Sequence, residues 1–188
     1  QGQTCHSYCT FCFRWAQFVG DKELRIAASE VDVLHRYLRR HIEVTDLLFT
    51  GGDPMVMKTR HLRDYLEPLL APEFDHIRTI RIGTKSLTFW PYRFLDADDA
   101  GELISLLERL VEAGKHVALM AHYNHWKELD TAAARAAIRR VRGTGAVIRG
   151  QGPLIKHIND DPAVWARLGK TQVQLGIVPY YMFVERDT

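Results

Sequence analysis

Residues 5–14 read CHSYCTFCFR, and the interpretation of the whole chain starts from this stretch. It holds all three cysteines of the sequence, Cys5, Cys9 and Cys12, in the spacing C-x3-C-x2-C. Disulfide scaffolds use cysteines in pairs, so three in one short loop favour binding of a soft metal. Iron–sulfur clusters are held mainly by thiolates, and three of them leave one iron of a [4Fe–4S] cluster open to a small molecule. The spacing therefore predicts an iron–sulfur site.

Two other interpretations of the cysteines stay open at this point. Zinc takes cysteine and histidine ligands, so the three thiolates could bind zinc with His6 or a distant histidine as the fourth ligand. The chain would then be a zinc-stabilised α/β binding module and not an enzyme. The three thiols could also be ordinary buried side chains that bind no metal.

The composition is that of an ordinary soluble protein. The chain has 188 residues, 46% of them hydrophobic and 26% charged, with a net charge of +2. This charge is too small to indicate nucleic acid or an anionic membrane as a partner. No apolar run approaches the roughly 18 residues of a membrane helix, and no signal peptide is visible. Thiols without disulfide partners fit a reducing compartment, so we expect a cytoplasmic protein.

The length fits one domain, so residues 1–188 are expected to form a single core domain. The first cysteine comes almost at the start of the chain, and the last residues follow an apolar run. Neither end resembles a finished terminus. We therefore expect a fragment that lacks N- and C-terminal extensions.

Short apolar runs alternate with amphipathic stretches along the rest of the chain. Strands are expected over 45–50, 77–83, 116–122, 146–151 and 172–183. A first helix is expected before these strands, capped by Ser29 and with Leu34, Tyr37, Leu38 and Ile42 on its apolar face. Four more helices are expected between the strands: one over 62–70, one between a cap at Asp96 and Gly114, one over 131–142, and one that starts at Asp160 or Asp161 before Pro162 and ends at Gly169.

This alternation predicts an α/β fold built from parallel βαβ units. With one more strand before the cysteine loop, it would form a partial (β/α)6 TIM-like barrel. Polar residues cluster where the strands end, at 51–53, 84–85, 122–125, 151 and 186–187. In barrels of this kind the active site forms at that rim. No Gly-x-Gly-x-x-Gly follows a strand, so a dinucleotide-binding fold has no direct support.

With these features the sequence resembles the radical S-adenosylmethionine enzymes. Their signature is the cysteine spacing seen here, with an aromatic residue, Phe11, just before the third cysteine. The segment 51–54, Gly-Gly-Asp-Pro after an apolar strand, looks like their glycine-rich motif, which receives the methionine amino group. Glycines let backbone carbonyls approach a ligand closely. Gly-Gly-Asp alone is typical of many turns, so the resemblance depends on its pairing with the cysteines.

A closer resemblance, to the lysine 2,3-aminomutase family, runs through nearly the whole chain. It is carried by segments 12–14, 81–84, 122–125, Gln151 with 154–160, and 179–181. The resemblance implies that the cluster reduces S-adenosylmethionine to a 5′-deoxyadenosyl radical. This radical takes hydrogen from an amino acid held as an aldimine of pyridoxal phosphate, and the amino group moves from carbon 2 to carbon 3. One branch of the family acts instead on a lysine of translation elongation factor P, which is the alternative substrate.

The resemblance also implies partners. The substrate would be a small-molecule amino acid, and an electron donor such as flavodoxin or ferredoxin would reduce the cluster. A homo-oligomer fits the family, whereas neither nucleic acid nor a membrane is expected as a partner.

Site residues carry over from the resemblance one position at a time. The predicted ligands of the cluster are Cys5, Cys9 and Cys12. The predicted S-adenosylmethionine-binding residues are Phe11, Gly51, Gly52, Asp53, Thr84, His122 and Gln151. Arg14 matches the arginine that binds the substrate carboxylate, and Asp160 matches a carboxylate that contacts the side-chain ammonium of lysine. Four of these residues also have a structural alternative. Arg14 could be an ordinary surface arginine, and Asp160 could cap the helix before Pro162. His122 and Gln151 could be merely structural polar residues at strand ends.

Two departures from the family pattern put the substrate in doubt. Members that act on lysine have a second carboxylate after the Pro-Tyr-Tyr segment, and Arg186 stands there in this chain. A cation would repel a substrate ammonium, so an acidic or neutral amino acid or another amine is expected. The lysine that binds pyridoxal phosphate lies beyond this segment in the family, and Lys85, Lys156 and Lys170 are not at its position. Pyridoxal phosphate is thus expected only if the full-length chain supplies that lysine.

Overall fold

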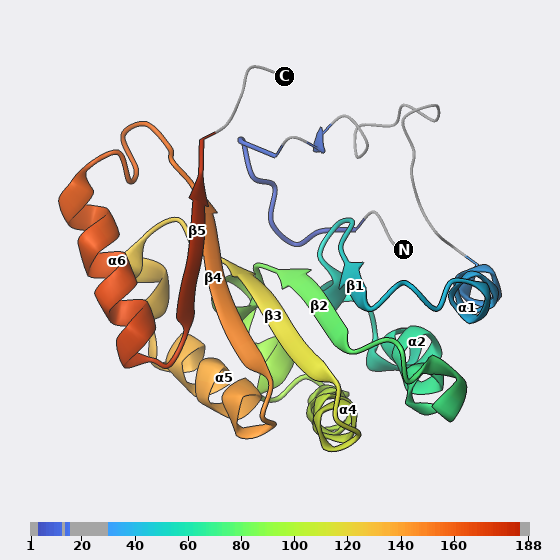
Figure 1. Cartoon of the computed structure of the whole chain (residues 1–188). Helices are drawn as coiled ribbons and strands as arrows, with labels where there is room; N and C mark the ends of the chain where they lie inside the picture. Colours follow the sequence, from blue (N-terminus) through green and yellow to red (C-terminus); the bar gives the residue numbers. More distant parts are fainter. Residues whose placement is uncertain (1–3, 13, 16–29, 185–188) are drawn as a thin grey trace.

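The computed structural model describes residues 4–12, 14–15 and 30–184, and it has an α/β architecture. Its sheet has five strands, all parallel, in the order in which they occur along the chain (Figure 1). The strands are β1 (Asp46–Phe49), β2 (Thr79–Thr84), β3 (His116–His122), β4 (Val147–Pro153) and β5 (Val178–Phe183). The partial TIM-like barrel is confirmed with these five strands. The sixth was expected before the cysteine loop and lies outside the described residues.

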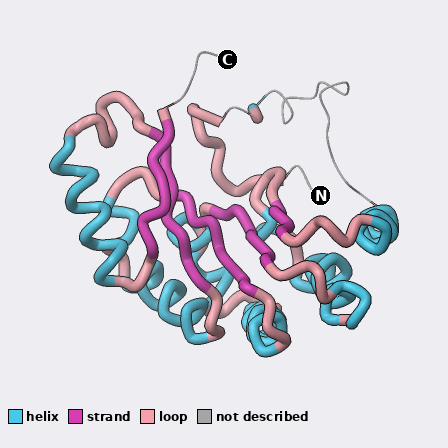
Figure 2. Tube along the Cα trace, in the orientation of Figure 1, coloured by secondary structure: helices cyan, strands magenta, loops and turns pink. Residues whose placement is uncertain are grey.

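Helices connect the strands and lie along one face of the sheet, as Figures 1 and 2 show. They are α1 (Val31–Arg40), α2 (Thr59–Leu66), α3 (Ser86–Phe89), α4 (Ala100–Glu112), α5 (Ala132–Gly143) and α6 (Pro162–Gln174). On the other face no described helix covers the strands, and Leu48 of β1 is half exposed there. Among the described residues no helix combines the length and apolarity needed to cross a membrane.

One hydrophobic core fills the space between the sheet and its helices. Alternate residues of β2 enter it, namely Ile80 and Ile82, as the two-residue period of a strand requires, whereas the middle of β3 is buried on both faces. Leucines at helical spacing in α4 meet them from the other side: Leu103, Leu106, Leu107 and Leu110. The helices thereby fix the strands, and the carboxyl ends of the strands are left free to carry a site.

Two predicted helix ends are wrong. Asp96 was expected to cap the helix that is α4, but α4 begins after Asp99. The Asp99 carboxylate accepts bonds from Thr59 N (2.6 Å) and from the buried Arg93 (2.7 Å), so tertiary contacts set this start. Gly169 was expected to end α6, but the helix continues to Gln174. Leu168 and Gln172 are buried on one face of that helix, and this packing outweighs the roughly 1 kcal/mol cost of an internal glycine.

The start of α1 also differs in part from expectation. Ser29, the predicted cap, lies outside the described residues, and the helix has Glu30 at its N-cap position. Its buried face carries Leu38 and His35, whose Nε2 lies 3.0 Å from Tyr65 O. Tyr37 and Ile42 were expected on that face and are exposed. His35, bonded to a backbone carbonyl, is thus buried on the face where the aromatic Tyr37 was expected.

Candidate active site

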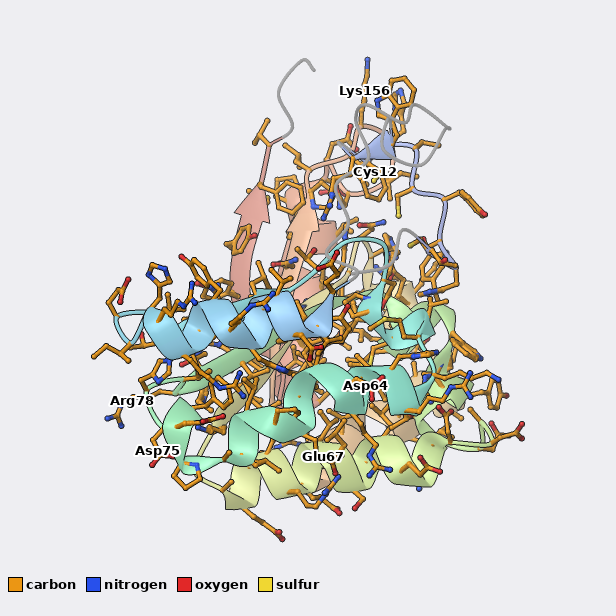
Figure 3. All side chains as sticks on the ribbon, turned by 90° about the vertical axis from the view of Figure 1, so that its right-hand side faces the viewer. Cys12, Asp64, Glu67, Asp75, Arg78 and Lys156 are labelled. Atoms are coloured by element: carbon orange, nitrogen blue, oxygen red, sulfur yellow. The ribbon has the colours of Figure 1, made fainter. Side chains whose placement is uncertain are left out.

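The cysteine loop passes beyond the carboxyl ends of the strands, where it is dark blue in Figure 1. Thr4 O accepts a hydrogen bond from Asp53 N at 3.0 Å, which ties the loop to the segment after β1. A turn closed by Cys12 N and Cys9 O (3.1 Å) brings the second and third cysteines together. All three thiols are free and partly buried. Figure 3 shows Cys12 at this end of the molecule, with Asp75 and Arg78, which precede β2, toward the other end.

The thiols share one electrostatic neighbourhood. Burial raises the pKa of the Cys5 thiol, and the charges of Asp53, Cys9 and Cys12 raise it further, against a lowering by a hydrogen bond with the Ser7 backbone. Ser7 Oγ also lies 3.1 Å from Cys9 Sγ. A metal that binds Cys5 must therefore displace a firmly held proton, which makes its binding pH-dependent.

The thiols fit a metal centre chemically but do not form a closed site. In the described ranges, no three side chains from His, Cys, Asp and Glu come close enough together to hold a metal ion. Three free thiols on one loop are nevertheless the donor set that iron–sulfur clusters use. Both ring nitrogens of His6, the candidate fourth zinc ligand, are buried without a hydrogen-bond partner among the described residues. Its ring packs near Phe89 and Trp90, with centroids 6.3 and 6.4 Å away.

Asp53 holds the glycine-rich segment in place. Its side chain is buried and accepts hydrogen bonds from Met55 N (2.9 Å), Lys85 N (2.7 Å) and Ser86 Oγ (3.2 Å). The Thr84 hydroxyl donates to it as well. Gly51 has a φ of 152°, a backbone angle that residues with a side chain rarely adopt, so a glycine is required there. The carboxylate thus joins the segment after β1 to the end of β2.

A second, partly buried carboxylate joins the ends of β2 and β3. Glu128 Oε2 accepts hydrogen bonds from Lys85 Nζ (3.3 Å) and Thr88 Oγ1 (3.2 Å). Its other oxygen, Oε1, accepts from the backbone N–H groups of Asn124 (2.9 Å) and His125 (3.2 Å). Lys85 is a buried cation whose Nζ also lies 4.4 Å from the centre of the Phe89 ring. Burying this charge requires such a partner, so the pair fixes the two loops together.

His122 connects the cysteine loop to the middle of the sheet. It is the last residue of β3, pairs with Gln151 of β4 in the strand register, and has its ring 5.5 Å from that of Phe11. Its Nε2 lies 2.8 Å from Asn124 Oδ1. Burial, assisted by the charge of Lys85, lowers the pKa of His122 to about 4. The imidazole is therefore neutral at physiological pH and able to accept a hydrogen bond.

Comparison with known proteins finds relatives along nearly the whole chain. The chain is 39% identical to "Putative L-lysine 2,3-aminomutase" of Aquifex aeolicus (strain VF5), over 98% of this chain and 47% of the relative. It is 29% identical to L-lysine 2,3-aminomutase of Escherichia coli (strain K12), over 96% of this chain and 49% of that protein. Over nearly its whole length the chain is therefore similar to the lysine 2,3-aminomutases.

Relatives with another stated substrate match as well. Glutamate 2,3-aminomutase of Clostridioides difficile (strain 630) is 28% identical over 95% of this chain and 39% of its own length. The chain spans about half the length of the curated relatives it matches. No protein-family model matches it.

The two predicted substrate residues of this aminomutase-like chain lie on different loops. Arg14 is partly buried, two residues after Cys12. Asp160 is exposed on the loop after β4, and a hydrogen bond with the His157 backbone lowers its pKa. The helix cap is Asp161, whose carboxylate accepts a hydrogen bond from Ala163 N at 2.8 Å. Asp160 therefore does not have the capping role that was its structural alternative. Arg186 lies outside the described residues.

Sequence reasoning did not single out several residues that organise this site. They are Ser86, Asn124, Glu128 and Asn159. Glu128 stands three residues after His125, and the two form a capping box, for which that spacing was an available signal. Neither Ser86 nor Asn159 carried any such signal, because their roles come from contacts between loops that are distant in the sequence. The ligand roles predicted for the cysteines, the glycines, Thr84 and Gln151 remain predictions.

Proposed function

We propose that this chain is the core of a radical S-adenosylmethionine enzyme in which Cys5, Cys9 and Cys12 hold a [4Fe–4S] cluster. One observation carries the proposal: three free thiols lie on a loop that is hydrogen-bonded, through Thr4 and Asp53, to a Gly-Gly-Asp segment at the carboxyl ends of a parallel sheet. Active sites of barrel enzymes form at that edge. When bound, the cluster would supply the electron that cleaves S-adenosylmethionine to a 5′-deoxyadenosyl radical.

The chain's own residues would bind and orient the cofactor. Gly51 and Gly52 allow a close approach of the backbone, whose carbonyls suit the methionine ammonium, and Asp53 holds them in register with β2. His122 is neutral and offers a hydrogen-bonding nitrogen, while Phe11 packs against its ring and shields it from water. A shielded site strengthens each polar contact made within it.

We infer that the reaction is 2,3-amino migration on an amino acid. The names of the relatives, which include lysine and glutamate 2,3-aminomutases, support this inference. The planar guanidinium of Arg14 suits the carboxylate that every amino acid carries. Arg186 favours a substrate with an acidic or neutral side chain, and pyridoxal phosphate belongs to the proposal if the full-length chain supplies its lysine. A cytoplasmic site of action and a flavodoxin or ferredoxin as reductant complete it.

The test is anaerobic reconstitution of the full-length protein with iron and sulfide, followed by electron paramagnetic resonance of the reduced protein. We expect a [4Fe–4S]⁺ signal that changes when S-adenosylmethionine is added. Changing Cys5, Cys9 or Cys12 to Ala should abolish both the signal and the cleavage. Tyr8→Ala is the matched control, because Tyr8 lies in the same loop and is 91% exposed. Bound zinc without a cluster, or full cleavage by a cysteine variant, would refute the proposal.

A further inference from the structure

Asn124, on the loop after β3, makes three hydrogen bonds at the carboxyl edge of the sheet. Its backbone N–H donates to Glu128 Oε1 at 2.9 Å, and its backbone carbonyl accepts from Asn159 Nδ2 at 2.8 Å. Its side-chain Oδ1 lies 2.8 Å from His122 Nε2. The backbone of this residue is therefore held from two sides, and its side chain meets the ring that contacts Phe11.

Asn159 provides the support from the β4 side. It is fully buried, and its Nδ2 also donates to Pro153 O at 2.9 Å, while its Oδ1 accepts from Ile155 N at 2.6 Å. The amide is thus satisfied entirely by backbone groups of the loops after β3 and β4. A buried amide bonded in this way has one orientation, because any other leaves polar groups without partners.

Glu128 provides the support from the β2 side. Its Oε1 accepts hydrogen bonds from Asn124 N and His125 N, and its Oε2 accepts them from Lys85 Nζ and Thr88 Oγ1. Each of these bonds involves a charged acceptor, and such bonds are stronger than neutral ones. Lys85 and Asp53 meet at the end of β2, where Asp53 accepts Lys85 N. The network therefore continues to the glycine-rich segment.

We propose that Asn124, held by Glu128 and Asn159, is a positioning residue that fixes the ring of His122 toward the S-adenosylmethionine site. The inference rests on the proposed function. An amide Oδ1 accepts only a donated hydrogen, so the bond places the proton of the neutral ring on Nε2. This leaves Nδ1 as an acceptor, suited to an N–H or O–H group of the ligand. S-adenosylmethionine carries such donors on its adenine, ribose and ammonium groups.

The test is a double-mutant cycle in the full-length, reconstituted protein, with the dissociation constant for S-adenosylmethionine as readout. Asn124→Ala removes only the side-chain bond, and we expect it to raise the dissociation constant about fivefold, the usual value of one neutral hydrogen bond. In a His122→Ala background the same change should have no further effect, because Asn124 acts through that ring. Asn124→Asp keeps an acceptor and should restore binding to within about twofold of the unchanged protein.

A matched control separates positioning from stability. Thr131→Ala removes another capping bond near this edge of the sheet, the one from Ala134 N to Thr131 Oγ1, and should lower thermal stability without changing the dissociation constant. Asn124→Ser carries the same expectation as Asn124→Ala, because its hydroxyl is too short to reach His122, and it serves if the alanine variant does not fold.

Two outcomes would overturn the inference: an unchanged dissociation constant in Asn124→Ala, or an equal loss in the His122→Ala background. Failure of the proposed function would look different. In that case the unchanged protein itself would show no response of its reduced cluster to S-adenosylmethionine.

Discussion

The Thr84 hydroxyl donates to both oxygens of the Asp53 carboxylate, at 2.8 and 2.9 Å, and so locks the end of β2 to the segment after β1. Both residues are buried. Since Asp53 N also donates to Thr4 O, the same residue links the cysteine loop to the sheet. The structure therefore gives the aspartate of the Gly-Gly-Asp segment a structural role.

Replacing Asp53 by Ala should therefore destabilise the fold strongly. It would leave the donors of Met55, Thr84, Lys85 and Ser86 buried without an acceptor, and we expect a loss of about 3 kcal/mol or more in the free energy of unfolding. Urea denaturation followed by circular dichroism measures it. The exposed Asp98 gives a control, because Asp98→Ala should stay within about 0.5 kcal/mol. Equal stability of the two variants would show that other groups satisfy these donors.

The strands were predictable because their signal is local. Apolar runs such as 117–121 indicate strands. The helical stretches between the strands provide crossover connections, which make neighbouring strands parallel. Polar residues after each strand then have to meet at one edge of the sheet. This reasoning placed Asp53, Thr84 and His122 at the same edge without any knowledge of their contacts.

The remaining features depend on contacts that no local pattern records. Ser86 reaches Asp53 from a position far along the chain, and Asn159 reaches Asn124 in the same way. Lys85 is buried although lysine is usually exposed, because Glu128 neutralises it. The cap of α4 moved from Asp96 to Asp99 for a similar reason. Tertiary hydrogen bonds decided each of these cases against the local propensity.

Arg14 tests the assignment of the substrate pocket. Arg14→Ala should leave cluster content and the effect of S-adenosylmethionine on the reduced signal unchanged, while turnover of the amino acid falls at least about tenfold, because a charge-assisted bond to the substrate carboxylate is lost. Arg14→Lys should recover only part of the activity, since an ammonium lacks the planar fork. Iron analysis and turnover assays on the same preparations measure both effects. A loss of iron at unchanged turnover per cluster would assign Arg14 to the structure of the loop.

His122 should make stability depend on pH in a defined window. Its pKa is about 4 in the folded protein, against 6.5 without burial, so the folded state binds fewer protons than the unfolded state between these values. Above about pH 6.5 this histidine does not change the free energy of unfolding with pH, and below it the free energy of unfolding falls as the pH falls toward 4. The loss in the free energy of unfolding over this range is about 3 kcal/mol, at 1.36 kcal/mol for each pH unit between the two pKa values.

Urea denaturation at a series of pH values tests this window. In His122→Gln the fall in stability between pH 6.5 and pH 4 should be smaller than in the unchanged protein by that amount. Thr131→Ala is the control, because it removes a helix-capping hydrogen bond without removing a titratable group and should lower stability by the same amount at every pH. Parallel curves for His122→Gln and the unchanged protein would mean that His122 takes up its proton as readily in the folded state as in the unfolded one.

Tyr123 offers a substitution that should not destabilise the fold. Its side chain is buried, and its hydroxyl has no hydrogen-bond partner in the part of the chain that the structure describes. It lines a cavity of about 240 Å³ between α6 and the last two strands, together with Trp165, whose Nε1 is also without a partner there. Burial raises the pKa of this phenol, so the hydroxyl stays neutral and carries only a desolvation cost.

Tyr123→Phe should therefore leave the free energy of unfolding unchanged or raise it by up to about 1 kcal/mol, because the ring keeps its packing and the unpaired hydroxyl is removed. Tyr123→Ala deletes the ring as well and should cost about 3 kcal/mol or more. Chemical denaturation of the three proteins gives both numbers. A loss of more than about 1 kcal/mol in Tyr123→Phe would mean that the hydroxyl is bonded in solution, to water in the cavity or to another part of the full-length protein.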